Sequence, residues 1–111
     1  MQAQMAAQNA PASPRFTLRN MHVMVDGKPH PIVNMNIQEV LIGGLPDWMA
    51  AGQRLEFSFV ITLKDWERSL PTYGVVIKND SAGLDVRYTP PLPSWRNILM
   101  KLLTEDSRGQ K

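Results

Sequence analysis

The stretch IVNMNIQEVLIGGLP, Ile32–Pro46, decides how this chain folds. Two rows of side chains alternate along its first half, a polar row and an apolar row: Asn34, Asn36 and Gln38, against Val33, Met35 and Ile37. This alternation predicts a β-strand with one buried face. Beyond Glu39 the apolar residues Val40 and Ile42 take even positions, so both halves face one core only if a bulge or tight turn lies near Gln38–Glu39. The polar row is either the rim of a binding surface or a solvated strand face before an ordinary hairpin.

Strand patterns continue on both sides of this stretch. Towards the N-terminus, Met21–Val25 reads as the first strand, and Asp26-Gly27 is a tight-turn pair that returns the chain through Pro29–Pro31. Towards the C-terminus, the segment RLEFSFVITLK, Arg54–Lys64, alternates most clearly. Its predicted buried face consists of Leu55, Phe57, Phe59, Ile61 and Leu63. Because both phenylalanines share this parity, we expect their rings in the core and not on an oligonucleotide-stacking surface.

The remaining strands complete an antiparallel architecture. Thr72–Lys78 is the expected partner of the long strand, reached through a polar link at Asp65–Pro71. After a turn at Asn79–Gly83, the side chains of Leu84–Tyr88 alternate once more. About six short strands at this spacing predict a barrel or a sandwich. A closed barrel over about residues 20–89 is favoured, because closure leaves no exposed strand edge in so small a sheet.

The end of the chain changes to helical periodicity. Prolines stop the last strand, and Ser94 is a good N-cap. The apolar residues that follow share one helical face: Trp95, Ile98, Leu99, Leu102 and Leu103. They predict a helix over about residues 94–105 that is buried against the barrel, because a helix of this length is marginal alone. Contact between two copies through this helix is the alternative, so we expect a monomer or a weak homodimer.

Composition excludes several classes of protein. The 111 residues suit a single domain, expected over about residues 15–105. The absence of cysteine excludes disulfides, thiolate metal sites and cysteine nucleophiles. The net charge of +2, with acidic and basic residues interleaved, argues against binding of a nucleic acid polymer or a membrane surface. No apolar run is long enough for a membrane span.

The ends of the sequence are polar. The segment MQAQMAAQNAPASP, Met1–Pro14, contains no charged residue and lacks the pattern of a signal peptide, so we expect a disordered tail on a cytoplasmic protein. Asp106–Lys111 is expected to fray. Between the central strands, Pro46–Ala51 is expected to form a short turn in which Trp48 and Met49 cover one end of the core.

Catalytic and metal-binding patterns are missing from the sequence. His22 and His30 are the only histidines, and no carboxylate stands at a metal-ligand or triad spacing from them. No glycine-rich phosphate loop is present. Four aspartates stand beside turn residues, where capping or solvation explains them as well as catalysis does: Asp47, Asp65, Asp80 and Asp85. We therefore expect no enzymatic activity, no metal and no cofactor.

The order of these features resembles the PilZ domain family. The shared features are an Arg-x-x-x-Arg pair before the first strand, a Gly-Leu-Pro-x-Trp segment, the stretches GQRLEFSF and YGVVIKNDSAGLDVRY, and a terminal amphipathic helix. The resemblance covers Arg15 to Glu105 and rests on the sequence of elements more than on invariant residues. It implies a six-stranded antiparallel β-barrel of PilZ type with a C-terminal helix, acting in bacterial cyclic di-GMP signalling as a receptor or adaptor and not as an enzyme.

The resemblance also implies a ligand site built from two motifs. Arg15 and Arg19 match the arginine pair, and Asn34 matches the start of an Asp/Asn-x-Ser-x-x-Gly motif. Asn36 stands where that motif has Ser, and Glu39 where it has Gly. Asn36 keeps hydrogen-bonding capacity, whereas Glu39 adds bulk and a negative charge. At about 4 Å from a phosphate that charge costs roughly 1 to 4 kcal/mol, or up to about three decades of affinity.

Two functions follow from this comparison. In the first, the chain is a PilZ-like receptor in which Arg15 and Arg19 grip guanine and phosphate while Asn34 and Asn36 orient the base. In the second, it is a degenerate PilZ-like adaptor that binds no nucleotide and acts through a protein partner, using Trp48, the terminal helix or an exposed barrel edge.

Overall fold

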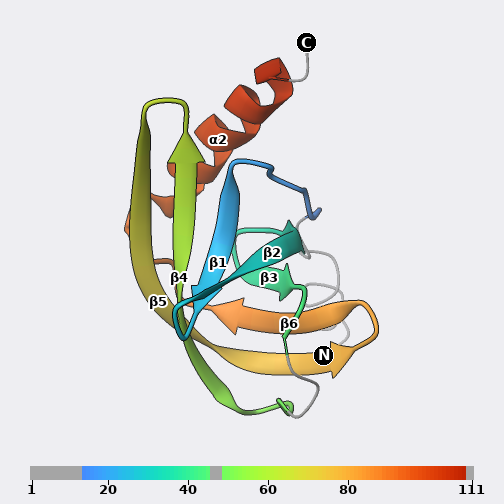
Figure 1. The fold of residues 1–111 in the computed structure, drawn as a ribbon. Helices are drawn as coiled ribbons and strands as arrows, with labels where there is room; N and C mark the ends of the chain where they lie inside the picture. Colours follow the sequence, from blue (N-terminus) through green and yellow to red (C-terminus); the bar gives the residue numbers. More distant parts are fainter. Residues whose placement is uncertain (1–13, 46–48, 110–111) are drawn as a thin grey trace.

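The structure, a computed structural model, describes residues 14–45 and 49–109. Within these residues the chain forms a closed barrel of six antiparallel strands followed by one helix (Figure 1). The elements are β1 (Met21–Val25), β2 (Lys28–Met35), β3 (Glu39–Ile42), β4 (Arg54–Leu63), β5 (Trp66–Asp80), β6 (Gly83–Tyr88) and α2 (Trp95–Gly109). Around the barrel the strand order is β1-β2-β3-β6-β5-β4. The predicted six-stranded antiparallel barrel with a C-terminal helix is confirmed.

The β1–β2 hairpin is tighter than predicted. Asp26 and Gly27 have φ of +51° and +78°, the left-handed conformation that a two-residue hairpin turn requires. β2 therefore begins at Lys28, and Pro29 and Pro31 lie inside the strand instead of in a return loop. Proline is tolerated at these positions because the register points their nitrogens away from β1, and β3 pairs with β2 only from Ile32 onward.

The break in register predicted near Gln38–Glu39 is a tight turn between β2 and β3. A second irregularity, which the sequence did not predict, is a bulge between Ile32 and Asn34. The bulge adds a residue to one strand, so Ile32 and Met35 are both buried while Val33 is 42% exposed. The prediction that Val33 shares the buried row with Met35 is therefore wrong.

The β4–β5 hairpin is the longest pairing in the barrel. The inward row of β4 is buried as predicted from Leu55 to Ile61, Phe57 and Phe59 included, whereas Leu63 is only partly buried. The chain turns at Lys64 and Asp65, and β5 already begins at Trp66, opposite Leu63. The predicted polar link at Asp65–Pro71 is therefore wrong: its residues after the turn extend a strand, and their polar side chains are exposed.

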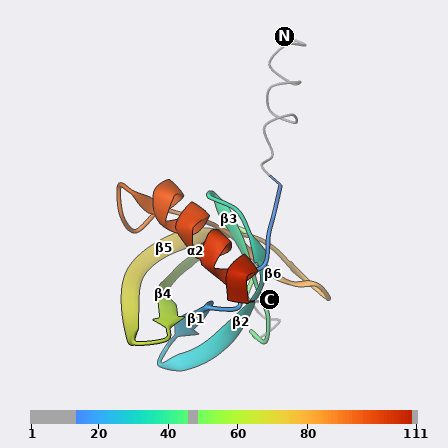
Figure 2. The same cartoon turned by 90° about the horizontal axis from the view of Figure 1, so that it is seen from above.

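Helix α2 lies across one end of the barrel (Figure 2). Trp95, Leu99 and Leu102 are buried in the same core as the strands, which confirms the predicted docking of the helix on its own barrel. The ring centroid of Trp95 lies 5.0 Å from that of Phe59. The helix runs to Gly109, beyond the end predicted near residue 105, because no helix-breaking residue comes earlier.

Some predictions concern residues outside the described ranges. These are the disordered tail, which except for Pro14 lies before the first described residue, the positions of Asp47 and Trp48, and the last two residues of the end expected to fray. Met49 is described and is buried in the core. In the part of the chain that the structure describes, no helix combines the length and the apolar character needed to cross a membrane.

Candidate functional site

The segment before β1, residues 14–19, is held against the barrel and is called the N-terminal strap below. Phe16 pairs with Met35 through two backbone hydrogen bonds of 2.8 and 2.9 Å, at the end of β2. The Thr17 hydroxyl donates to the Val33 carbonyl at 3.0 Å, and Leu18 is buried in the core. These contacts fix the backbone on either side of Phe16, so the side chain of Arg15 is directed over the outer face of β2, β3 and β6.

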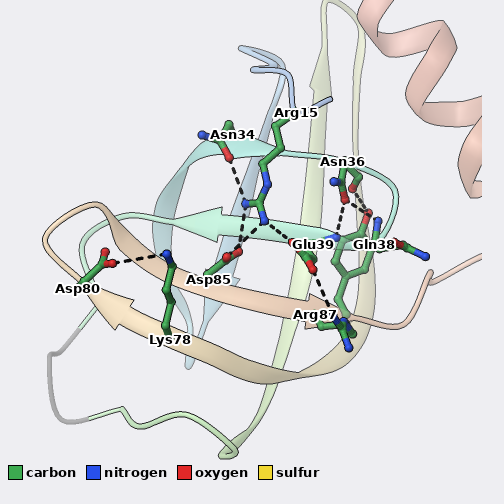
Figure 3. A network of polar contacts seen from close by, with 10 residues as sticks. Arg15, Asn34, Asn36, Gln38, Glu39, Lys78, Asp80, Asp85 and Arg87 are labelled. Atoms are coloured by element: carbon green, nitrogen blue, oxygen red, sulfur yellow. Dashed lines mark hydrogen bonds and ion pairs between the residues drawn. The ribbon is translucent and has the colours of Figure 1, made fainter. Parts of the chain in front are cut away.

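Arg15 lies at the centre of a polar cluster on that outer face (Figure 3). Its Nη1 donates to Asn34 Oδ1 at 3.3 Å and to Asp85 Oδ1 at 3.0 Å. Its Nη2 donates to Asp85 Oδ2 at 3.2 Å and to Glu39 Oε1. Arg15 and Asp85 thus form a two-pronged ion pair, the strongest arrangement available to a guanidinium and a carboxylate. The cluster joins the strap to three strands.

The charges in this cluster are partly shielded from water. The side chains of Arg15, Glu39 and Asp85 are 27%, 22% and 10% exposed. Burial by itself would lower the pKa of Arg15, but the hydrogen bonds and negative charges of Asp85 and Glu39 raise it above its ordinary value. The guanidinium of Arg15 therefore stays charged, and it contacts two carboxylates, those of Glu39 and Asp85.

Glu39 bridges two arginines. Besides its contact with Arg15, its Oε2 accepts from Arg87 Nη2 at 3.4 Å. Arg87 is opposite Glu39 in the β3–β6 register, and its side chain is 70% exposed. The side chain of Glu39 therefore lies across the surface between the strap and β6, instead of pointing into open solvent.

Asn36 is part of the turn and is buried. Its Oδ1 accepts hydrogen bonds from the backbone N–H groups of Gln38 and Glu39, both at 2.8 Å. Its own carbonyl accepts from the Tyr88 hydroxyl at 2.8 Å, inside the barrel end. This side-chain oxygen shapes the β2–β3 turn and so positions Glu39.

The residues singled out in the sequence reach different places. Arg15, Asn34 and Glu39 meet in one cluster, and Asn36 lies in the adjacent turn. Arg19 is exposed, beyond the buried Leu18 at the far end of the strap.

Asp85 is the residue that sequence reasoning missed. The sequence pattern explains it by turn capping or solvation, whereas the structure buries it in the middle of β6 and pairs it with Arg15. That explanation is therefore wrong for Asp85. One signal was present, because Asp is a poor residue for the interior of a strand unless a partner stabilises it.

A hollow lies beside the β2–β3 turn. Its volume is about 540 Å³, and its lining includes Gln38, Arg87 and Arg96. This volume falls in the range of small-molecule sites, and two of the lining side chains are cationic. Among the described residues, no group of three or more His, Asp or Glu side chains is arranged to hold a metal ion.

Comparison with known proteins adds no relative: no protein-family model matches the chain, and no curated protein matches its sequence.

Proposed function

We propose that this chain is a PilZ-like domain that binds cyclic di-GMP on the outer barrel face around Arg15 and the β2–β3 turn. The observation that carries the proposal is the meeting of Arg15 with Asn34, at 3.3 Å, and with Glu39. The first residue comes from the arginine pair and the other two from the second motif. A guanidinium fork suits both the guanine edge and phosphate oxygens, and an amide suits the base.

The surroundings of the cluster support an anionic ligand. Arg87 and Arg96 line the hollow beside the turn, and Arg19 is exposed on the strap. The two arginines of the hollow offer positive charge to two phosphates, while the hollow offers space for a base. Arg19 is assigned to the same ligand by the family motif.

Binding requires a rearrangement of Arg15. Its guanidinium is engaged by Asp85 and Glu39, and a nucleotide has to compete with both carboxylates. Hydrogen bonds to charged groups contribute about 1.5–3 kcal/mol each, so giving up one of them costs the ligand roughly one to two decades of affinity. The nucleotide therefore binds with a rearrangement of the Arg15 side chain, and the changed surface is the signal that a partner reads.

Titration calorimetry with cyclic di-GMP tests this proposal. Arg19→Ala is the best loss variant, because Arg19 is exposed while Arg15→Ala would leave the buried Asp85 without its partner. We expect Arg19→Ala to weaken binding by about tenfold or more. Lys28→Ala is the matched control, since Lys28 is exposed at the β1–β2 turn. Binding that survives Arg19→Ala unchanged would remove the assigned site.

Replacement of Glu39 tests the competing charge. Glu39→Gln keeps the shape of the side chain and removes its charge, and Glu39→Gly restores the residue of the family motif. We expect both to strengthen cyclic di-GMP binding by about tenfold or more, because a negative charge near the phosphates is lost and Arg15 is partly released. Equal or weaker binding by Glu39→Gln would contradict this role of Glu39.

A second function is favoured because Arg15 and Asn36 already form hydrogen bonds within the chain. Both Nη atoms of Arg15 donate to carboxylates, and Asn36 Oδ1 accepts two backbone hydrogen bonds. A domain whose ligand groups are committed to its own fold suits an adaptor that acts through protein contacts. Absence of heat from the wild type and from Glu39→Gln would end the receptor proposal and favour the adaptor.

A further inference from the structure

The tip of the β4–β5 hairpin extends past the strands beside it, alongside helix α2 (Figure 1). On the β4 side, pairing with β1 ends at Ile61, and the last backbone contact is from Thr62 N–H to the Asn20 carbonyl at 2.8 Å. On the β5 side, β6 pairs only from Gly74 onward. Within the described residues, the first part of β5 therefore pairs with β4 alone and faces the helix.

A groove lies between this part of β5 and α2, and it is called the hairpin–helix groove below. Trp66, Arg68 and Leu70 line it from β5, where alternate residues share one face. Ile98, Lys101 and Leu102 line it from α2, where residues three and four apart share one face. The groove has a volume of about 280 Å³. This is below the usual size of a cofactor site and suits one or two apolar side chains.

The groove combines an apolar floor with a cationic rim. Leu70 and Leu102 are buried in its floor, and Trp66, which also lines the groove, is 48% exposed. Arg68 and Lys101 are the charged residues that line it, and both are exposed. Glu67 lies on the opposite face of β5 by strand alternation. Trp and Arg are enriched at the residues that contribute most to protein–protein binding, so a groove lined by an exposed tryptophan and two cations favours a protein partner.

We propose that the hairpin–helix groove binds a short peptide segment of a partner protein, with an aromatic or aliphatic anchor flanked by Asp or Glu. The anchor occupies the apolar floor beside Trp66, and the acidic residues pair with Arg68 and Lys101. A second copy of the chain is the poorer occupant. In a symmetric dimer in which the groove meets itself, the cationic rim of one subunit would face the cationic rim of the other.

This inference does not rest on nucleotide binding. The groove lies at the β4–β5 tip, whereas the Arg15 cluster lies on β2, β3 and β6. A peptide assay without nucleotide and a calorimetric titration without peptide can therefore fail independently.

Panning of a phage-displayed library of short random peptides on the full chain tests the proposal. We expect enriched sequences to carry an apolar anchor with Asp or Glu beside it. Fluorescence polarisation of a labelled enriched peptide is expected to show about tenfold weaker binding to Trp66→Ala and to Lys101→Glu. Lys28→Glu, the same charge change at the opposite end of the barrel, is expected to bind as the wild type does.

Several results would overturn the proposal. Lys101→Glu changes an exposed side chain, so it remains informative even if Trp66→Ala disturbs the hairpin. Absence of enriched sequences, enrichment of basic ones, or equal binding to the wild type and Lys101→Glu would each reject the assigned chemistry. A concentration-dependent dimer in light scattering that Trp66→Ala abolishes would assign the groove to a second copy instead.

Discussion

At the scale of single residues, Asp85 stands out because it is a buried carboxylate in the middle of a strand. Such a group is costly unless it is paired, and here both of its oxygens accept from Arg15. The two residues are 70 positions apart in the sequence, and their pairing holds the N-terminal strap on the barrel. The stability of the strap therefore depends on a residue outside both motifs singled out in the sequence.

Asp85→Asn tests this dependence. The amide keeps the shape of the side chain but removes the charge and one acceptor, so we expect the free energy of unfolding to fall by about 1–3 kcal/mol. We also expect faster hydrogen exchange at the Phe16 amide, which pairs with Met35. Asp80→Asn is the control, because it makes the same change in an exposed ion pair, in which Asp80 Oδ2 lies 3.8 Å from Lys78 Nζ. Equal behaviour of the two variants would contradict a special role for Asp85.

At the scale of elements, Tyr88 connects β6 to both the β2–β3 turn and helix α2. Its hydroxyl donates to the Asn36 carbonyl at 2.8 Å and accepts from Trp95 Nε1 at 2.6 Å. Burial raises the pKa of Tyr88 above its ordinary value, and only the bond from Trp95 acts in the opposite direction. The phenol therefore stays protonated in the folded chain at pH values where it ionises in the unfolded chain.

The sign of the resulting pH dependence follows from this shift. Below about pH 10 the phenol is protonated in both states and stability is unaffected; above it the unfolded state loses the proton first, so stability falls as pH rises. We expect the wild type to lose up to about 1.4 kcal/mol per pH unit more than Tyr88→Phe in this alkaline window. At neutral pH, Tyr88→Phe is expected to have a free energy of unfolding about 1–3 kcal/mol lower than the wild type, because the Asn36 carbonyl and the Trp95 indole N–H lose their partner. Tyr73→Phe, at an exposed site, is the control, and urea titrations at several pH values give the comparison.

The same scale shows what could be predicted from sequence. Strands β1, β4 and β6 follow from local alternation, because each buries one face along most or all of its length. The bulge at Val33 could not be predicted, since nothing in the local pattern marks the residue that is added. The start of β5 at Trp66 could not be predicted, because the polar side chains of residues 66–71 are typical of a loop. Their backbone nevertheless pairs with β4.

The candidate site was predictable only in part, for a related reason. Arg15, Asn34 and Glu39 were found through motifs that are local in sequence. The pairing of Arg15 with Asp85 depends on the barrel, which brings β6 beside β3 and under the strap. No local pattern encodes such a contact.

At the scale of the whole molecule, helix α2 completes the core of the barrel. Leu99 is 3% exposed, and the adjacent Met100 is 59% exposed on the same helix. We expect Leu99→Ala to lower the free energy of unfolding by about 2–5 kcal/mol, because it leaves a cavity between the helix and the barrel end. Met100→Ala is the matched control and is expected to change stability by less than about 0.5 kcal/mol. Chemical denaturation distinguishes the two, and a small effect of Leu99→Ala would contradict the helix as part of the core.

The closed strand order also has a kinetic consequence. Four of the pairings join neighbouring strands in sequence, but β1 meets β4 through Met21 and Ile61, and β3 meets β6 through Glu39 and Arg87. These two seams close long loops, and the entropy of closure is lost before their contacts are gained. Hairpins form within microseconds, so the slow step of folding is the joining of the seams, on the order of milliseconds to seconds. Until that step, one edge of each of β1, β3, β4 and β6 is unpaired. In a partly folded molecule these edges are available to pair with strands of another copy, which leads to aggregation.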